Sequence, residues 1–314
     1  MRYYLAPMEG ITTWIYRNAY HQYFRPMDKY FTPFLVPHTN GSFSHKEKNE
    51  ILPEHHPGQN LIPQIMTNRA EDFVRTAEAL QAYGYKEVNL NLGCPSGTVV
   101  SKGRGAGFLR DPDALDAFFD QVFSALDIKI SVKTRIGLDA PEEFEELLKV
   151  YNRYPLEELI IHPRIRQDFY KNRPNMEVFA KAVKKSVNPV CYNGDLYTAE
   201  DIAAFQREFP QVGAVMIGRG ILKNPGLIGE AEGRGNAKKG TLRKFHDRIY
   251  QDYRANMSGD KNTVFKMKEF WSYLKDFFED GEKCWKKIKK AQNRADYESA
   301  VEEIFTRERN SGKI

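Results

Sequence analysis

Residues 87–107 read EVNLNLGCPSGTVVSKGRGAG, and they contain a strand-like run, a cysteine and a glycine-rich segment in succession. The run from Glu87 to Leu92 alternates polar and apolar residues, which predicts a β-strand. Cys94 follows between a glycine and a proline, and the glycine-rich segment after it is too long for an ordinary turn. Because long loops at strand ends are often functional, Cys94 is a candidate site residue. The alternative is a structural thiol, since free cysteines commonly pack in protein cores.

The strand-like pattern recurs on both sides of this stretch and alternates with segments of helical periodicity. Further strands are predicted at residues 3–8, 30–35, 61–66, 128–133, 159–162, 189–193 and 214–218, with helices at 12–24, 69–83, after 111, 141–154, 176–186 and 198–209. Eight strand–helix units over about 230 residues are typical of a parallel (β/α)8 TIM barrel, an α/β fold. A doubly wound open sheet is the alternative. It rarely needs eight units, and the first strand–helix turn lacks the GxGxxG pattern of dinucleotide-binding folds.

The chain changes character after the last predicted strand. Residues 232–240, EGRGNAKKG, are glycine-rich and polar and indicate a linker. Helices are predicted beyond it at 241–257, 263–278, 282–292 and 296–307. Their apolar residues recur at helical spacing and predict a bundle core rather than a surface for stacking bases: Phe265, Phe270, Trp271, Leu274, Phe277 and Phe278. We therefore expect a barrel over residues 1–235 and a small helical bundle over 236–314.

The net charge of +5 is unevenly distributed along the 314 residues. Residues 238–314 hold 19 Lys and Arg against 13 Asp and Glu, which leaves 28 against 29 in the rest of the chain. A dense part of this charge surrounds Ile288 and consists of Lys283, Lys286, Lys287, Lys289 and Lys290. Such asymmetry suggests a polyanionic partner, and the alternative is a solvated helical surface.

Other features of the sequence indicate the compartment of the protein and argue against membrane and metal-binding classes. The three cysteines, Cys94, Cys191 and Cys284, are odd in number and far apart, which favours a reducing compartment over a disulfide framework or a zinc site. No apolar run approaches the ~20 residues that span a bilayer, and the first residues lack a signal-peptide pattern, so a cytoplasmic protein is expected. We expect no metal site, because His55 and His56 are adjacent and have no clustered partners.

The residues that follow the predicted strands are strongly polar, and in a barrel these strand ends carry the chemistry. They include Gln64, Asn91, Cys94, Lys133, Arg135, His162, Arg164, Arg166, Asn193, Gly194, Asp195, Gly218 and Arg219. Any one of them could be structural. The NGD and GRG motifs follow the last two strands, where many barrels bind phosphate through backbone N–H groups, a helix N-terminus and an arginine. With Lys133 facing a ring atom and Gln64 a heterocycle edge, this set suits flavin mononucleotide (FMN).

The ordered motifs give a more specific expectation. Across residues 6–225 the chain contains APMEGIT, IPQIM, NLNLGCP, KGRGAGFL, SVKTRIG, IIHPRIRQDFY, NGD and VMIGRGILKNP. This set resembles the tRNA-dihydrouridine synthases. The resemblance implies FMN-dependent reduction of uridine to 5,6-dihydrouridine in tRNA, with NADPH or NADH as the reductant, by a monomer. It also implies that the helical segment is a tRNA-binding domain.

The resemblance also implies residue roles. Cys94 would donate a proton to C5 of uracil, after hydride transfer from reduced FMN to C6. The implied FMN contacts are Pro7, Met8, Glu9, Gln64, Lys133, His162, Asn193, Gly194, Asp195, Gly218 and Arg219. The implied uridine contacts are Asn91, Arg164 and Arg166.

The chain departs from the family pattern in two places, and two other functions remain open. The family often has HGRT where this chain has HPRI from His162 to Ile165, and the loop after Cys94 reads GAGF where small residues commonly continue. A rival interpretation is an FMN barrel that acts on a free pyrimidine. Another is an RNA-binding protein that keeps the barrel only as a scaffold.

Overall fold

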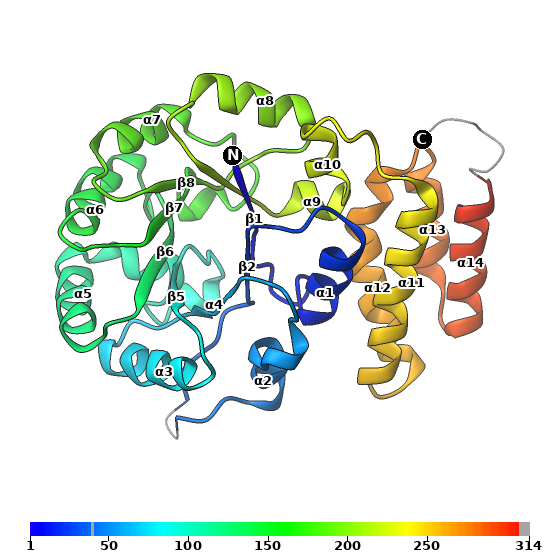
Figure 1. Ribbon diagram of the computed structural model, residues 1–314, viewed down its shortest axis with the longest axis horizontal. Coiled ribbons are helices and arrows are strands. Elements are labelled where there is room, and N and C mark those ends of the chain that lie inside the picture. Colours follow the sequence, from blue (N-terminus) through cyan, green and yellow to red (C-terminus); the bar gives the residue numbers. More distant parts are fainter. Residues whose placement is uncertain (39–40, 308–314) are drawn as a thin grey trace.

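The structure, a computed structural model, describes residues 1–38 and 41–307 (Figure 1). The strands are β1 Arg2–Leu5, β2 Lys29–Phe31, β3 Leu61–Ile62, β4 Gln64–Ile65, β5 Glu87–Leu92, β6 Lys129–Arg135, β7 Glu158–His162, β8 Val190–Tyr192 and β9 Ala214–Ile217. All of their pairings are parallel, in the order β3-β2-β1-β9-β8-β7-β6-β5-β4.

The two strands at the ends of this order are consecutive in the chain, so the sheet closes on itself. β3 pairs with β2, and β4 pairs with β5. Only Pro63 separates β3 from β4 in the chain. Proline has no N–H to donate, so the ladder is interrupted at this point. β3 and β4 together form the single strand predicted at 61–66. The predicted eight-stranded TIM barrel is thereby confirmed.

Helices surround the barrel and then continue beyond it (Figure 1). Those that alternate with the strands are α1 Trp14–Tyr23, α2 His45–Ile51, α3 Ala70–Ala82, α4 Gly97–Val100, α5 Pro112–Ala125, α6 Phe144–Tyr151, α7 Met176–Lys185, α8 Ala199–Glu208, α9 Arg219–Lys223 and α10 Leu227–Ala231. The short 3-10 helices are η1 Pro53–His55, η2 Gly105–Arg110, η3 Pro141–Glu143, η4 Arg166–Asp168 and η5 Lys275–Phe277. The C-terminal helices are α11 Lys239–Asn256, α12 Asp260–Leu274, α13 Gly281–Lys290 and α14 Arg294–Arg307.

Local sequence explains several helix boundaries. Asp111 caps α5 by accepting a hydrogen bond from the Ala114 N–H at 3.0 Å, and Pro112 occupies the first helical position. Thr198 begins α8 with a capping box, in which its hydroxyl accepts from the Asp201 N–H and the Asp201 carboxylate accepts from the Thr198 N–H. The sequence therefore predicted these two starts closely.

The barrel interior has an apolar side and a polar side. The apolar side is a separate cluster made of Tyr4, Ala6, Phe31, Ile62, Ile160, Cys191, Ala214 and Met216. On β5, residues Val88, Leu90 and Leu92 belong to the core between strands and helices, so the alternate residues Glu87, Asn89 and Asn91 face the interior. The polar side of the interior thus follows from the period-2 pattern of one strand.

The C-terminal helices pack against α1 of the barrel and share its hydrophobic core. The Tyr16 ring on α1 lies 5.6 Å from the Phe245 ring on α11 and 6.1 Å from the Phe270 ring on α12. Phe270 is buried, as predicted for the bundle core. The prediction was wrong for Phe265, which is 62% exposed. Helix α12 turns this position away from α1 and from the other C-terminal helices. None of the helices in the described part of the chain is long and apolar enough to cross a membrane.

Candidate active site

A pocket lies at the carboxyl ends of the strands. Its walls come from the loops after β1, β7 and β8 and from the ends of β6, β7 and β9. The lining residues are Ala6, Pro7, Met8, Lys133, His162, Tyr170, Asn193, Gly194, Asp195, Gly218 and Arg219. The structure therefore brings together most of the residues that were predicted to bind a cofactor, as expected for the top of a barrel.

Lys133, on β6, contributes an unpaired positive charge to this pocket. It is half-buried, and among the described residues its ammonium group has neither a hydrogen bond nor a salt bridge. Burial, together with the nearby Arg135 guanidinium, lowers the pKa of Lys133 to about 8. A buried cation without a partner is costly, so the pocket favours an anionic or strongly polarised ligand atom here.

His162, at the end of β7, is a neutral donor in the same pocket. Burial lowers the pKa of His162 well below its ordinary value, and surrounding cations lower it further: Arg135, Lys133, Arg164 and Arg219. Arg164 Nη1 donates to His162 Nε2 over 3.0 Å, so the neutral ring carries its proton on Nδ1. The pocket thus presents an N–H donor among several positive charges.

Asp195, in the loop after β8, holds two of these arginines in place. Its Oδ1 accepts from Arg164 Nη1 at 3.1 Å and from Arg219 Nη2 at 2.6 Å. Arg164 is only 1% exposed, and its Nε also donates to the Asn172 carbonyl at 2.6 Å. Arg164 therefore faces Asp195 and His162, whereas Arg219 is 25% exposed and lines the pocket.

Two glycines, one in the NGD motif and one in the GRG motif, pack closely against neighbouring groups. A Cβ on Gly194 would lie 2.1 Å from the Tyr192 hydroxyl oxygen, and a Cβ on Gly220 would lie 2.0 Å from the Leu196 carbonyl oxygen. No other residue type fits these positions without displacing neighbouring atoms. The NGD and GRG motifs thus pack the loops after β8 and β9 tightly together.

Cys94 is half-exposed just beyond β5, while Cys191 and Cys284 are buried. Asn91 Oδ1 accepts hydrogen bonds from the Gly93 and Cys94 N–H groups, both at 3.0 Å. Gly105 packs against the cysteine with φ +54°, and a Cβ there would lie 2.9 Å from Cys94 Cβ. The long loop seen in the sequence contains α4 and η2, and these hold the cysteine from the other side.

Gln64 and Asn91 lie below the pocket, inside the barrel. Gln64 is fully buried, and its Nε2 donates to Asn89 Oδ1 at 2.8 Å. Asn91 is 7% exposed, and its Nδ2 donates to Gln64 Oε1 at 2.7 Å. The structure therefore joins a predicted cofactor contact and a predicted substrate contact by a direct hydrogen bond.

Besides Gln64 and Asn91, four predicted site residues lie outside the pocket lining: Glu9, Cys94, Arg164 and Arg166. The Glu9 side chain is 43% exposed and forms a salt bridge with Lys46 at 2.5 Å. Arg166 begins η4, and its guanidinium carbon lies 5.5 Å from the centre of the Phe169 ring. Glu9 lies in the segment after β1, and Arg166 lies in η4 after β7.

The structure adds Tyr170 and Arg135 to the site. The Tyr170 ring stacks on His162 with 6.0 Å between ring centres, and Arg219 Cζ lies 4.8 Å from the Tyr170 ring centre. Arg135 donates to the carbonyls of Gly93, Ile165 and Phe169, each at 2.9 Å, so it ties the loop before Cys94 to the loop after β7. The sequence marked Arg135 as a polar strand end without a role, while no periodicity signal located Tyr170.

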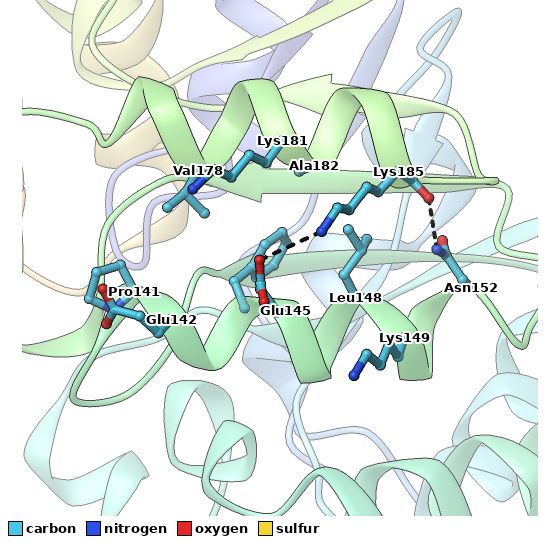
Figure 2. A pocket seen from close by; sticks show the side chains of 11 residues that line it. Pro141, Glu142, Glu145, Leu148, Lys149, Asn152, Val178, Lys181, Ala182 and Lys185 are labelled. Atoms are coloured by element: carbon cyan, nitrogen blue, oxygen red, sulfur yellow. Dashed lines mark hydrogen bonds and ion pairs between the residues drawn. The ribbon is translucent and has the colours of Figure 1, made fainter.

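Figure 2 shows a second pocket, a groove between α6 and α7 on the outside of the barrel. Leu148 and Val178 contribute apolar surface, and Lys185 Nζ reaches Glu145 Oε1 at 3.6 Å. Asn152 Nδ2 donates to the Lys185 carbonyl at 2.9 Å. All three lysines of this groove have carboxylate partners, since Lys149 pairs with Glu146 and Lys181 with Glu177, unlike Lys133 in the barrel pocket.

Within residues 1–38 and 41–307, no group of His, Cys, Asp or Glu side chains could hold a metal ion.

Comparisons with known proteins find relatives along nearly the whole chain. The family described as dihydrouridine synthase (Dus) matches residues 4–310. A probable tRNA-dihydrouridine synthase of Staphylococcus aureus (strain Mu50) is 29% identical over 282 residues, which cover 86% of this chain and 82% of the relative. The tRNA-dihydrouridine synthase B of Pasteurella multocida is 30% identical over 231 residues, covering 72% of this chain and 68% of the relative.

A solved structure agrees with the fold. A variant of NCR from Zymomonas mobilis superimposes with a TM-score of 0.51 at 15% identity, covering 78% of this chain and 90% of that chain. At this identity the likeness concerns the fold alone. The family match extends over nearly all of the chain and includes every strand end of the pocket. The chain therefore belongs to the dihydrouridine synthase family.

Proposed function

We propose that this protein is an FMN-dependent tRNA-dihydrouridine synthase that reduces uridine in tRNA to 5,6-dihydrouridine, with NADPH or NADH as the reductant. The observation that carries this proposal is the charge of the pocket. Cations gather around His162, and in the described part of the pocket lining the single carboxylate is that of Asp195. Such an excess of positive charge suits an anionic, phosphate-bearing cofactor.

The residues present fit FMN. The tightly packed glycine loops and Arg219 would hold its phosphate, and the unpaired Lys133 ammonium would face a polarised atom of its ring. The remaining residues proposed to contact it are Pro7, Met8, Glu9, Gln64, His162, Asn193, Gly194, Asp195 and Gly218. When bound, FMN would supply the hydride that adds to C6 of uracil.

Cys94 would supply the proton. Addition of hydride at C6 leaves carbanion character at C5, which requires a nearby acid. The half-exposed Cys94 is fixed by Asn91 on one side and Gly105 on the other, so its thiol is a defined donor. Asn91 and Arg166 remain proposed uridine contacts. The pairing of Arg164 with Asp195 favours a role for Arg164 in orienting Asp195 and His162.

The C-terminal domain proposed over residues 236–314, which contains α11 to α14, would bind the tRNA. A target base must leave its stack before it can enter the pocket, and this costs a few kcal/mol. Phosphate contacts from a basic helical surface offset that cost and make binding salt-dependent. Helix α13 carries the lysines and follows η5, whose Asp276 forms a 2.7 Å salt bridge with Lys223 of α9. The basic helix α13 thus directly follows a segment that contacts α9, the helix that begins with Arg219.

The test combines absorbance spectroscopy with anaerobic mixing. Purified protein should show flavin absorbance that bleaches with NADPH and returns when unmodified tRNA is added. Cys94→Ala should bind FMN but turn over poorly, whereas Cys284→Ala, in the helical region, should retain turnover. Flavin reoxidised by free uracil but not by tRNA would overturn the proposal in favour of a free-pyrimidine enzyme. Protein that binds tRNA but takes up no FMN would leave only an RNA-binding barrel.

A further inference from the structure

The polar side of the barrel interior contains an unbroken row of hydrogen-bonded side chains, which we call the lumen ladder: Asn91, Gln64, Asn89, Ser131 and Glu87. The successive donor–acceptor distances from Asn91 to Glu87 are 2.7, 2.8, 2.9 and 2.8 Å. All members are buried, with exposed fractions between 0 and 7%. The ladder leads from the backbone of the Cys94 turn down to the opposite end of the barrel.

Strand register explains how the ladder forms. Gln64 of β4 is paired with Asn89 of β5, and Asn89 is paired with Ser131 of β6. Glu87, Asn89 and Asn91 alternate along β5 and therefore share its inner face. The row thus depends on side chains from three neighbouring strands of the described barrel.

Each hydrogen bond in the ladder has only one possible direction. At the upper end, the Gly93 and Cys94 N–H groups can only donate, so Asn91 must turn its oxygen toward them and its Nδ2 toward Gln64. At the lower end, both oxygens of Glu87 accept from Lys29 Nζ, at 3.0 and 2.8 Å.

The members between the two ends inherit this direction. Ser131 donates to the Glu87 carboxylate, so its oxygen is left to accept from Asn89 Nδ2, and Asn89 Oδ1 then accepts from Gln64 Nε2. Rotating any one amide by half a turn would set donor against donor and acceptor against acceptor. Both ends of the ladder therefore impose the same orientation on Gln64.

This orientation determines which amide hydrogen-bonding groups of Gln64 and Asn91 are left unused by the ladder. The ladder uses one N–H of the Gln64 amide and one N–H of the Asn91 amide, and the second N–H of each has no partner among the described residues. In the proposed complex these are the groups that would donate to the cofactor. The same Asn91 orientation also keeps its oxygen on the Cys94 turn.

We propose that Asn89 and Ser131 are positioning residues, which act through Gln64 and Asn91 to fix the amide pattern offered to the cofactor and to hold the Cys94 turn. This inference rests on the proposed function for the identity of the ligand. Its physical basis is that a buried polar network is rigid only when every member is satisfied. Loss of the Ser131 hydroxyl removes the acceptor of Asn89 Nδ2, so Asn89, Gln64 and Asn91 are then held from the upper end alone and less rigidly.

The test compares Ser131→Ala with a matched variant on the same strand. Tyr151→Phe also removes a buried hydroxyl bonded to β6, since Tyr151 Oη lies 3.0 Å from Thr134 Oγ1, but on the helix-facing side of the strand. The first readout is the rate at which iodoacetamide alkylates Cys94 in FMN-free protein, identified by mass spectrometry of the peptide. The second is the Kd for FMN.

We expect Ser131→Ala to raise the alkylation rate several-fold and to weaken FMN binding several-fold, because the turn and the amides are then held from the upper end only. Tyr151→Phe should leave both values as in the wild type, and Ser131→Thr, which keeps the hydroxyl, should restore both. Equal effects of Ser131→Ala and Tyr151→Phe would overturn the proposal, since general loosening would then explain them. No change in either readout for Ser131→Ala would overturn it as well.

Two further points keep the experiment decisive. If Ser131→Ala does not fold, Ser131→Cys offers a side chain of nearly the same shape and a weaker donor, and it is expected to show the same changes at smaller size. If the wild-type protein binds no FMN, the proposed function fails. The alkylation comparison, made without FMN, still decides whether the ladder holds Cys94.

Discussion

Lys133 is the residue whose chemistry depends most directly on its surroundings. An ordinary lysine is charged far above neutral pH, but burial and the neighbouring Arg135 lower the pKa of Lys133 to about 8. The ammonium is therefore present below that pH and lost above it. Any ligand group that is stabilised by this charge should bind less well in alkaline solution.

We predict that the Kd for FMN rises by about tenfold between pH 7 and pH 9, because one pKa unit corresponds to a tenfold change in an equilibrium. Lys133→Met should bind FMN more weakly at pH 7 and should lose this part of the pH dependence. Lys129→Met is the matched control, since Lys129 starts the same strand with a side chain that is 62% exposed. Fluorescence titration across this pH range measures the effect. An identical pH profile for Lys133→Met and wild type would contradict the assignment.

At the scale of elements, the α4–η2 segment determines where Cys94 sits. Gly105 begins η2 with a positive φ of +54°, and it touches both Cys94 and Val99. Gly107 also packs closely, because a Cβ there would lie 2.6 Å from the Val100 carbonyl oxygen. The glycines of this segment therefore serve close packing around the cysteine rather than flexibility.

Gly105→Ala should lower the turnover number strongly while the protein remains folded. The added Cβ would lie 2.9 Å from both Cys94 Cβ and the Cys94 carbonyl oxygen, so the cysteine must move. A displacement of about 1 Å can cost roughly a hundredfold in rate. Gly97→Ala is the control, since nothing lies within 4 Å of a Cβ at that position. Single-turnover reoxidation by tRNA is the measurement, and equal rates for the two variants would refute this role of Gly105.

The contact between α1 and α11 joins the C-terminal helices to the barrel. Phe245 of α11 is fully buried, with its ring 5.1 Å from Phe24 and 5.6 Å from Tyr16. Thr13 and Tyr253 add a hydroxyl–hydroxyl hydrogen bond of 3.1 Å at the start of α1. These contacts extend one hydrophobic core from the barrel into the C-terminal helices.

Phe245→Ala should destabilise the protein by about 3–5 kcal/mol, the usual range for truncating a buried phenylalanine. Phe265→Ala provides the comparison, because this residue is 62% exposed and should change stability by no more than about 0.5 kcal/mol. Thermal unfolding followed by circular dichroism measures both. If the two variants unfold at the same temperature, α11 does not stabilise the barrel through this contact.

At the scale of the whole molecule, charge separates the barrel from the C-terminal helices. The excess of positive charge lies in residues 238–314, and the exposed lysines of α13 are its densest part. Among these lysines, Lys287 forms a salt bridge with Glu303. Lys286 and Lys290 are exposed and lie four residues apart, so they share one face of the helix.

We predict that the double variant Lys286→Glu, Lys290→Glu binds tRNA more weakly and with a smaller salt dependence, by a slope of about 1 for each phosphate contact removed. FMN binding should stay the same, because the pocket is built by the barrel. Lys181→Glu, Lys184→Glu on α7 makes the same change of charge on an exposed barrel helix and should leave tRNA affinity nearly unchanged. Equal losses in the two double variants would indicate only a general charge effect.

Local patterns were sufficient to predict the barrel and to predict which strand ends meet in the pocket. The alternation of apolar residues in strands and their spacing in helices are properties of neighbouring residues, so the eight units could be predicted from the sequence. Parallel strands in a barrel must present their carboxyl ends on one face, which predicted that Lys133, His162 and Asp195 would meet. The helix start at Asp111 follows from equally local capping chemistry.

The partners of polar side chains were decided only by the tertiary structure. The pairing of Arg164 with Asp195, the three carbonyls held by Arg135 and the direction of the lumen ladder all join residues that are distant in sequence. The exposure of Phe265 depends in the same way on how α12 rotates against α1. Periodicity determines which face of an element is apolar, because that is local. Strand register and helix packing determine which groups meet across the core, because contacts there depend on the whole chain at once.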